Sequence, residues 1–262
     1  MNLIGYLMAF LTPGAFLYID LLAAATNALN GALLAQRPDH YRRKYFTAVG
    51  ILVMALFGGI GGGTTRDILL NELPGSWTNP WYLILVILAW ILGLYLAWGK
   101  GQTFRETFYQ FMTSFSLPWY AVVGVEKGLQ AGWPLLGAIA LGVVGPTAGR
   151  YLIDITSGVP AKQLVQGEWF IGTAVITSLS FFLLRAGAFG APWSLALGLV
   201  PAALIAFLIG FVFRVAATWF GWEEPMPRGI PAWLLKGQPK RETLKEKMQP
   251  GWEPSWEEPP QE

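Results

Sequence analysis

The most constraining feature of the sequence is a glycine-rich segment, residues 58–63, in which five of the six residues are glycine. Apolar runs lie on both sides of this segment, and Arg66 and Asp67 follow it closely. Each glycine inside a helix costs about 1 kcal/mol relative to alanine, so the segment predicts a broken helix. In a lipid bilayer, exposed backbone and two charges are tolerated only where protein or a water-filled cavity surrounds them.

The composition predicts an integral membrane protein. Hydrophobic residues make up 54% of the 262 residues and charged residues only 13%, whereas a soluble domain usually contains about 25% charged residues. The 13 Trp and 9 Tyr residues suit the two membrane interfaces, where an apolar ring with a polar edge is favoured. The flanks of the glycine segment are therefore expected to lie in a bilayer.

Several classes of function are disfavoured by the residue content. The chain has no Cys and a single His, His40, so we expect no disulfide framework, no Ser-His-Asp set and no transition-metal site. The glycine segment fits neither the phosphate-binding loop nor the dinucleotide-binding spacing. A formal net charge of +2 gives no indication of nucleic-acid binding. We therefore expect a protein that is not an enzyme and that uses no cofactor.

Seven apolar segments approach the roughly 20 residues that a membrane-crossing helix needs. They are residues 14–35, 45–65, 80–98, 108–128, 133–150, 168–186 and 193–220. Residues 1–13 are expected to form an N-terminal extension. Residues 221–262 alternate Pro, Glu, Lys and Trp without an apolar period, which predicts a polar tail that is partly disordered.

The basic residues predict the orientation of these spans. Fifteen of the 18 Lys and Arg residues fall on one side of the predicted membrane, and three, Arg66, Lys127 and Arg185, fall on the other. Cytoplasmic segments carry the excess of Lys and Arg in multi-pass proteins. We therefore expect the plasma (inner) membrane, with the N-terminus outside and the C-terminus and its tail in the cytoplasm.

An internal repeat relates the two halves of the chain. The segment that ends at Arg66 and Asp67 is matched by a second small-residue segment, residues 143–150, that ends at Arg150 with Asp154 nearby. Each lies in the middle helix of a three-helix set, so the two copies must have opposite topology, as in many transporters and channels. The predicted fold is an all-α membrane protein of two inverted three-helix repeats, 14–104 and 105–190, and a seventh helix, 191–220, with helices two and five broken.

The motif Gly61-Gly62-Gly63-Thr64-x-Arg66-Asp67-x-Leu69-Leu70, followed by Pro74, resembles that of the bacterial relatives of the trimeric intracellular cation channels. The same domain is also known as a glycine-transporter-like family of two tandem repeats. The resemblance covers residues 14–220, although the second repeat departs from the pattern, because Gly145-Pro146-Thr147-Ala148-Gly149-Arg150 has its acid four residues later. The resemblance implies seven helices, a homotrimer with one pore per protomer, and permeation of monovalent cations.

Charged residues inside a membrane are functional candidates because they are costly to bury. Helical angles also place polar side chains on single faces of spans one, four and six. For isolated Ser and Thr residues, and for the glycines, helix–helix packing is the alternative explanation. The predicted pore or transport path comprises Gly61, Gly62, Gly63, Thr64, Thr65, Arg66, Asp67, Asp20, Asn27, Gly145, Gly149, Arg150, Asp154 and Lys127.

The faces of spans four and six add neutral candidates to the path. They are Tyr109, Thr113, Ser116 and Tyr120 in span four, and Thr173, Thr177 and Ser180 in span six. Lys127 has a second interpretation, an interfacial pair with its neighbour Glu126. The basic loop with Arg42, Arg43 and Lys44 would attract anionic lipid headgroups, unless it serves only as a topology signal.

Three functions remain open on the sequence. The leading one is passive conduction of K⁺ and Na⁺ along the polar faces, with acidic side chains and carbonyl oxygens favouring cations. The alternative is a secondary transporter of a small amino acid such as glycine, whose carboxylate would bind at a half-helix N-terminus after Gly63, with help from Arg66. The third is a lipid-binding membrane scaffold, in which the polar side chains are fully paired.

Overall fold

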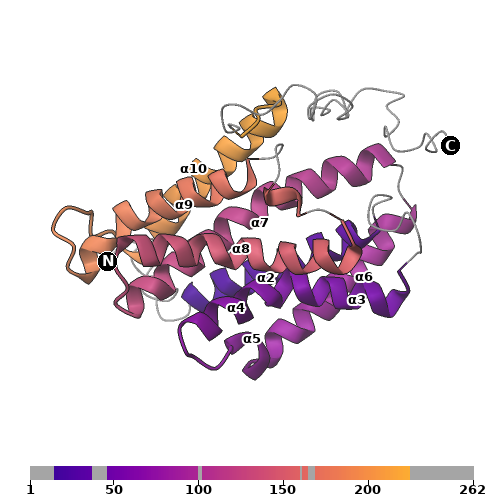
Figure 1. Cartoon of the computed structure of the whole chain (residues 1–262), viewed down its shortest axis with the longest axis horizontal. Coiled ribbons are helices and arrows are strands. Elements are labelled where there is room, and N and C mark those ends of the chain that lie inside the picture. The colour runs from indigo at the N-terminus through magenta and orange to yellow at the C-terminus, as the bar shows by residue number, and fades with distance from the viewer. Residues whose placement is uncertain (1–14, 37–45, 100–101, 160, 165–168, 225–262) are drawn as a thin grey trace, which may run out of the picture.

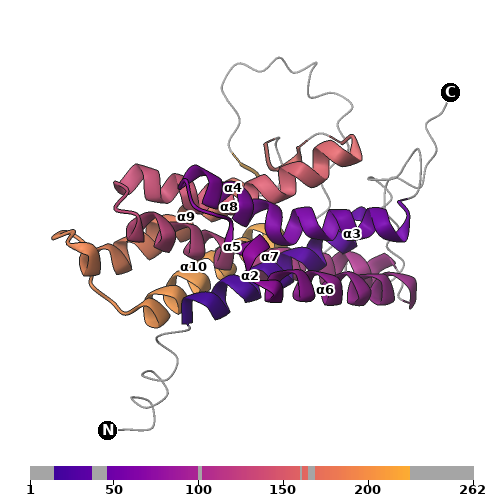
Figure 2. The ribbon, with the colours of Figure 1, turned by 90° about the horizontal axis from the view of Figure 1, so that it is seen from below.

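The computed structural model describes residues 15–36, 46–99, 102–159, 161–164 and 169–224. These residues form an elongated bundle whose long helices run mostly along its longest axis (Figure 1; Figure 2). The predicted N-terminal extension, most of the predicted tail and the basic loop with Arg42, Arg43 and Lys44 lie outside the described residues.

The first half of the chain forms three long helical segments. These are α2 (Ala15–Ala35), the continuous segment α3 (Ala48–Leu56), η2 (Phe57–Gly61) and α4 (Gly62–Leu69), and then, after the short α5 (Gly75–Thr78), α6 (Pro80–Gly99). The second half comprises α7 (Gln102–Gln130), α8 (Leu135–Ser157), η3 (Lys162–Leu164), α9 (Phe170–Arg185), η4 (Ala186–Phe189) and α10 (Leu199–Phe220). Helices α2 and α7 pack against each other and join the two halves.

Five helical segments in the described ranges are long and apolar enough to cross a membrane. They are Ala15–Ala35, Ala48–Leu69, Leu135–Ser157, Phe170–Phe189 and Leu199–Phe220. Helices α6 and α7 contain the predicted spans 80–98 and 108–128 but are not among these five. The count of seven crossings therefore stays a prediction. Large apolar side chains point outward from the bundle, among them Leu88 on α6 and Leu208 on α10, as a lipid environment requires.

The buried apolar side chains form two main clusters that follow the two halves of the chain. One is built mostly from α2, α3 and α6, with Val86 and Ala32 fully buried. The other is built mostly from α7, α9 and α10, with Phe181 and Ala206 fully buried. Each half therefore has its own core, although the inverted relation between the halves stays a prediction.

The prediction that helices two and five are broken is wrong. Residues 48–69 are helical throughout, because α3 passes into the π-helical turn η2 and then directly into α4. Helix α8 likewise continues through Pro146. The glycine segment instead adopts one π-helical turn, a feature found mostly as single turns inside α-helices and often at functional sites.

Close helix crossings explain why these glycines remain helical. A Cβ atom at Gly62 would overlap the carbonyl oxygen of Gly145 on α8, and one at Gly149 would lie 2.7 Å from the carbonyl oxygen of Phe57. On the other side of the segment, a Cβ at Gly58 would lie 2.5 Å from the carbonyl oxygen of Asn27. Tertiary packing therefore outweighs the low helix propensity of glycine.

Replacing Gly62 tests this packing account. Gly62→Ala is expected to lower the free energy of unfolding by at least about 2 kcal/mol, because the new methyl group meets backbone that cannot rotate away. Gly63→Ala is the matched control, since its Cβ would meet only Nη2 of Arg66 at 3.8 Å; its higher helix propensity predicts a gain of up to about 1 kcal/mol. Unfolding in mixed micelles measures both, and equal effects of the two variants would contradict the account.

Candidate functional site

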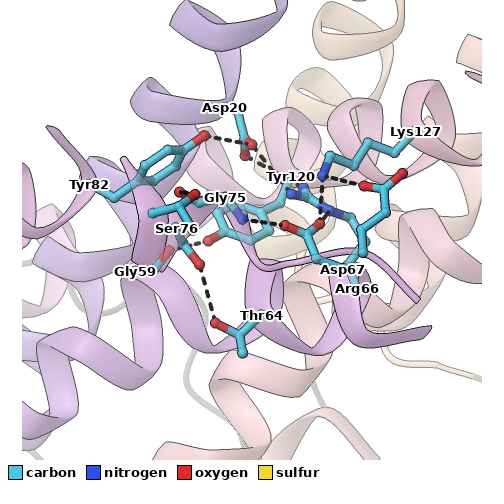
Figure 3. Close-up of polar contacts among 12 residues, drawn as sticks. Asp20, Gly59, Thr64, Arg66, Asp67, Gly75, Ser76, Tyr82, Tyr120 and Lys127 are labelled. Carbon is cyan, nitrogen blue, oxygen red and sulfur yellow. Dashed lines mark hydrogen bonds and ion pairs between the residues drawn. The ribbon is translucent and has the colours of Figure 1, made fainter. Parts of the chain in front are cut away.

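Five charged side chains meet where α2, α4 and α7 converge, and we call this group the Arg66 cluster (Figure 3). Nη2 of Arg66 lies 3.3 Å from Oδ2 of Asp20, and its Nε lies 2.9 Å from Oδ1 of Asp67. Nζ of Lys127 lies 2.7 Å from the same oxygen of Asp67 and 3.3 Å from Oε2 of Glu72. Asp67 thus links the arginine of its own helix to the lysine of α7.

The charged side chains of the cluster become more exposed from Arg66 and Asp67 through Lys127 to Glu72. The side chains of Arg66 and Asp67 are 2% and 1% exposed, that of Lys127 is 16% exposed and that of Glu72 is 51% exposed. Two cations and two buried carboxylates balance in charge, as burial requires, because an unpaired buried charge is strongly destabilising. Glu72 adds a further negative charge at the exposed end.

Neutral groups donate further hydrogen bonds to both aspartates. The hydroxyl of Tyr82 on α6 donates to Oδ2 of Asp20 at 2.8 Å, and the backbone N–H of Gly75 donates to Oδ2 of Asp67 at 3.0 Å. The chain returns to Gly75 through a turn in which Asn71 has a positive φ of 57°. The cluster therefore draws together α2, α4, α6, α7 and the turn before α5.

Among the residues that the structure describes, one polar side chain of α7 bonds to the π-helical turn η2. The hydroxyl of Tyr120 donates to the carbonyl oxygen of Gly59 (Figure 3). Thr64 and Thr65, which follow the turn, do not bond to α7: Thr65 donates to the carbonyl oxygen of Gly61 in its own helix at 2.9 Å, and Thr64 pairs with Ser76 and Trp77. Tyr120 thus bonds to the glycine segment from the opposite half of the chain.

Arg150 and Asp154 form a second charged group, separate from the Arg66 cluster. Nε of Arg150 lies 3.2 Å from Oδ1 of Asp154 one turn along α8, and its Nη1 donates to the hydroxyl of Tyr109 on α7. Gly149 lies against Phe57 and Gly145 lies against Gly62, so α8 runs antiparallel to the segment from η2 to α4, and Arg66 and Arg150 lie on opposite sides of this crossing. The structure therefore does not bring the two arginines together.

Amide and hydroxyl groups join α2 to α7 between these charged groups. Nδ2 of Asn30 donates to Oγ of Ser116 at 2.8 Å, and that hydroxyl lies 3.2 Å from Oδ1 of Asn27. The span-six candidates Thr173 and Thr177 instead donate to carbonyl oxygens of their own helix. For those two threonines the packing alternative is the better explanation.

The suggested pairing of Lys127 with Glu126 is wrong. Glu126 faces α9, where its carboxylate accepts from Nε and Nη2 of Arg185, both at 3.1 Å. Consecutive residues of a helix point about 100° apart, so neighbouring charges bind different partners. Sequence reasoning also missed Tyr82 and Glu72 as members of the cluster; a tyrosine hydroxyl in an otherwise apolar span was the available signal for Tyr82.

No arrangement in the described ranges indicates a metal centre, since no three His, Cys, Asp or Glu side chains are grouped to hold an ion. The chemistry of the Arg66 cluster is that of paired charges and hydrogen bonds.

The chain is similar in sequence to known membrane proteins. The model of the glycine transporter family matches residues 17–98. A UPF0126 membrane protein of Deinococcus radiodurans is 28% identical over 189 residues, covering 70% of this chain and 78% of the relative. The UPF0126 inner membrane protein YadS of Escherichia coli K12 is 23% identical over 211 residues, covering 80% of this chain and 94% of the relative.

Solved channel structures share the fold. The trimeric intracellular cation channel orthologue from Rhodobacter sphaeroides has a TM-score of 0.65 and 27% identity, covering 78% of this chain and 97% of that one. A prokaryotic channel of the same type, in 0.5 M KCl, has a TM-score of 0.66 and 15% identity, covering 79% and 96%. The chain is a multi-pass membrane protein with the fold of these channels.

Removing Asp20 tests how far the cluster depends on charge balance. Asp20→Ala leaves Arg66 buried with one carboxylate fewer, so we expect a loss of about 3–5 kcal/mol in the free energy of unfolding. Glu72→Ala removes the half-exposed acid of the same cluster and should cost less than about 1 kcal/mol. The double variant Asp20→Ala/Arg66→Ala should be more stable than additivity predicts. Additive effects in unfolding titrations would show that the pair is not coupled.

Proposed function

We propose that the protein is a channel for monovalent cations, K⁺ and Na⁺, with one path in each protomer of a homotrimer. The likeness to the cation channels supports the class of function. The observation that carries the proposal is a column of polar side chains along α2 and α7, two helices that pack against each other.

The polar column is nearly as long as the hydrocarbon core of a bilayer is thick. On α7 it runs from Tyr109, the partner of Arg150, through Ser116 and Tyr120 to Lys127, the partner of Asp67. Eighteen residues of helix rise about 27 Å, which is close to the roughly 30 Å of hydrocarbon in a bilayer. A lipid-binding scaffold requires no polar column of this length through its interior.

The charges of the column favour cations despite its basic residues. Arg66 is held by Asp20 and Asp67, and Arg150 is held by Asp154, so each guanidinium is neutralised before an ion arrives. The additional carboxylate of Glu72 lies at the exposed end. Fixed carboxylate and carbonyl oxygens replace part of the hydration of a cation, as in other selective pores.

The described conformation is the closed one in this proposal. Lys127 bridges α7 to both Asp67 and Glu72, and Tyr120 bridges α7 to the glycine segment. These bonds lie across the column, so ions can pass only when some of them separate. Lys127 is the most exposed of the cluster's basic side chains, and its departure from Asp67 would free a carboxylate for the permeating ion.

Amino-acid transport is less well supported. That mechanism needed a half-helix N-terminus after Gly63 to bind a carboxylate, but η2 and α4 are continuous there. Arg66, which would have assisted, is already held by two carboxylates.

Seven crossings in two inverted repeats, an outside N-terminus and an inner-membrane location complete the proposal.

Flux through purified protein in liposomes tests the channel. We expect ⁸⁶Rb⁺ uptake driven by a K⁺ gradient that is unaffected by millimolar glycine, together with unitary currents in planar bilayers. Protein-free liposomes are the control. Saturable uptake of labelled glycine without unitary currents would contradict the proposal and favour the transporter, whereas the absence of both would favour a scaffold.

A further inference from the structure

Two buried oxygen atoms on the facing sides of α2 and α7 have no hydrogen-bond partner among the described residues. They are Oδ1 of Asn30 and Oγ1 of Thr113, in residues that are 8% and 3% exposed. A polar group removed from water without a partner is costly, and such groups in native structures point to a water or an ion. We therefore expect a water molecule or an ion to bind these two oxygen atoms.

Thr113 differs from other buried threonines of the bundle. Oγ1 of Thr177 donates to the carbonyl oxygen of Thr173 at 2.8 Å, and Oγ1 of Thr26 donates to that of Leu22 at 2.7 Å. This bond to the preceding turn is the usual way for a threonine to be satisfied in a membrane helix. Thr113 makes no bond of this kind, so its Oγ1 is available to a ligand.

Several of the surrounding donor groups are already engaged. Nδ2 of Asn27 donates to the carbonyl oxygen of Ala23, Nδ2 of Asn30 donates to Ser116, and the hydroxyl of Ser116 lies within hydrogen-bond distance of Oδ1 of Asn27. Thr113 lies one turn before Ser116 on the same face of α7. These bonds leave at least one lone pair free on each of the four side-chain oxygens.

We propose that Asn27, Asn30, Thr113 and Ser116 form a binding site for a largely dehydrated monovalent cation. The inference rests on the proposed channel function and assigns the central site of its path. Oδ1 of Asn30 and Oγ1 of Thr113 are the principal ligands. Oδ1 of Asn27 and Oγ of Ser116 complete the group with lone pairs that their existing bonds leave free.

The chemistry of the four oxygens selects the class of ion. An anion is disfavoured because none of the four side chains carries a positive charge and all four present oxygen atoms with free lone pairs. Ca²⁺ and Mg²⁺ prefer carboxylate ligands and bound water, and the four side chains carry no charge. Neutral amide, hydroxyl and carbonyl oxygens are instead the ligands with which pores replace the hydration shell of K⁺.

The position of the site suits a resting point for an ion in transit. On α7, Thr113 and Ser116 lie between Tyr109, which binds Arg150, and Lys127, which binds Asp67. On α2, Asn30 lies ten residues, or about 15 Å, beyond Asp20. A cation at the level of Asn30 is therefore at least two helical turns from Asp20. The charged pair that lies nearer to Thr113 is Arg150 with Asp154, whose charges balance.

Cation-dependent thermal stability tests the site directly. With KCl replacing N-methyl-D-glucamine chloride at constant ionic strength, the wild-type protein should show a rise in Tm that saturates with K⁺. Thr113→Val removes one ligand at nearly constant volume, so the half-saturating K⁺ concentration should rise about tenfold. The same variant should be no less stable than wild type without K⁺, because it removes an unpartnered hydroxyl.

Two control variants separate the site from general effects. Thr113→Ser keeps the hydroxyl and should keep the K⁺-dependent shift, while Thr177→Val removes a hydroxyl that bonds within its own helix and should also keep it. A K⁺ shift that is absent in wild type, or unchanged in Thr113→Val, would overturn the site and leave the two oxygens to water. If the shift follows Thr113 but liposomes show no ⁸⁶Rb⁺ flux, the site stands and the channel proposal fails.

Discussion

The ion pairs of Arg66 are the interaction on which the arrangement of the helices depends. A guanidinium that is 2% exposed in a membrane-spanning segment requires carboxylates close by. The pair of Arg66 with Asp67 lies within one helix, whereas its pair with Asp20 ties α4 to α2. Tyr82 and Lys127 then bring α6 and α7 to the same carboxylates.

The glycine crossing gives this cluster its position in the bundle. Because Gly62 lies against Gly145, helices α4 and α8 approach at backbone distance and place Arg66 and Arg150 on opposite sides of the contact. Each arginine is neutralised within its own half of the chain. The stretch between them is lined by amide and hydroxyl groups of α2 and α7, which makes the centre of the molecule polar without making it charged.

Much of this fold could be predicted from hydrophobic length and from the cost of burying charge. The positions of the long helices follow from apolar runs, and the choice of Arg66, Asp67 and Asp20 as candidates follows from their place inside such runs. The continuity of the glycine segment could not be predicted, because propensity is a local quantity and the compensating contacts come from Gly145 and Asn27, far away in sequence. The partners of Glu126 and Lys127 likewise depend on which helix each residue faces.

The chain contains no cysteine, so a single introduced thiol can report whether ions pass between α2 and α7. The most direct measurement is the current through Asn27→Cys channels in a planar bilayer, before and after a cationic methanethiosulfonate reagent is added. The proposed path predicts that modification blocks most of the current, whereas the same reagent on Leu92→Cys, on the outward face of α6, leaves it unchanged. Unaltered current through fully modified Asn27→Cys channels would contradict the path.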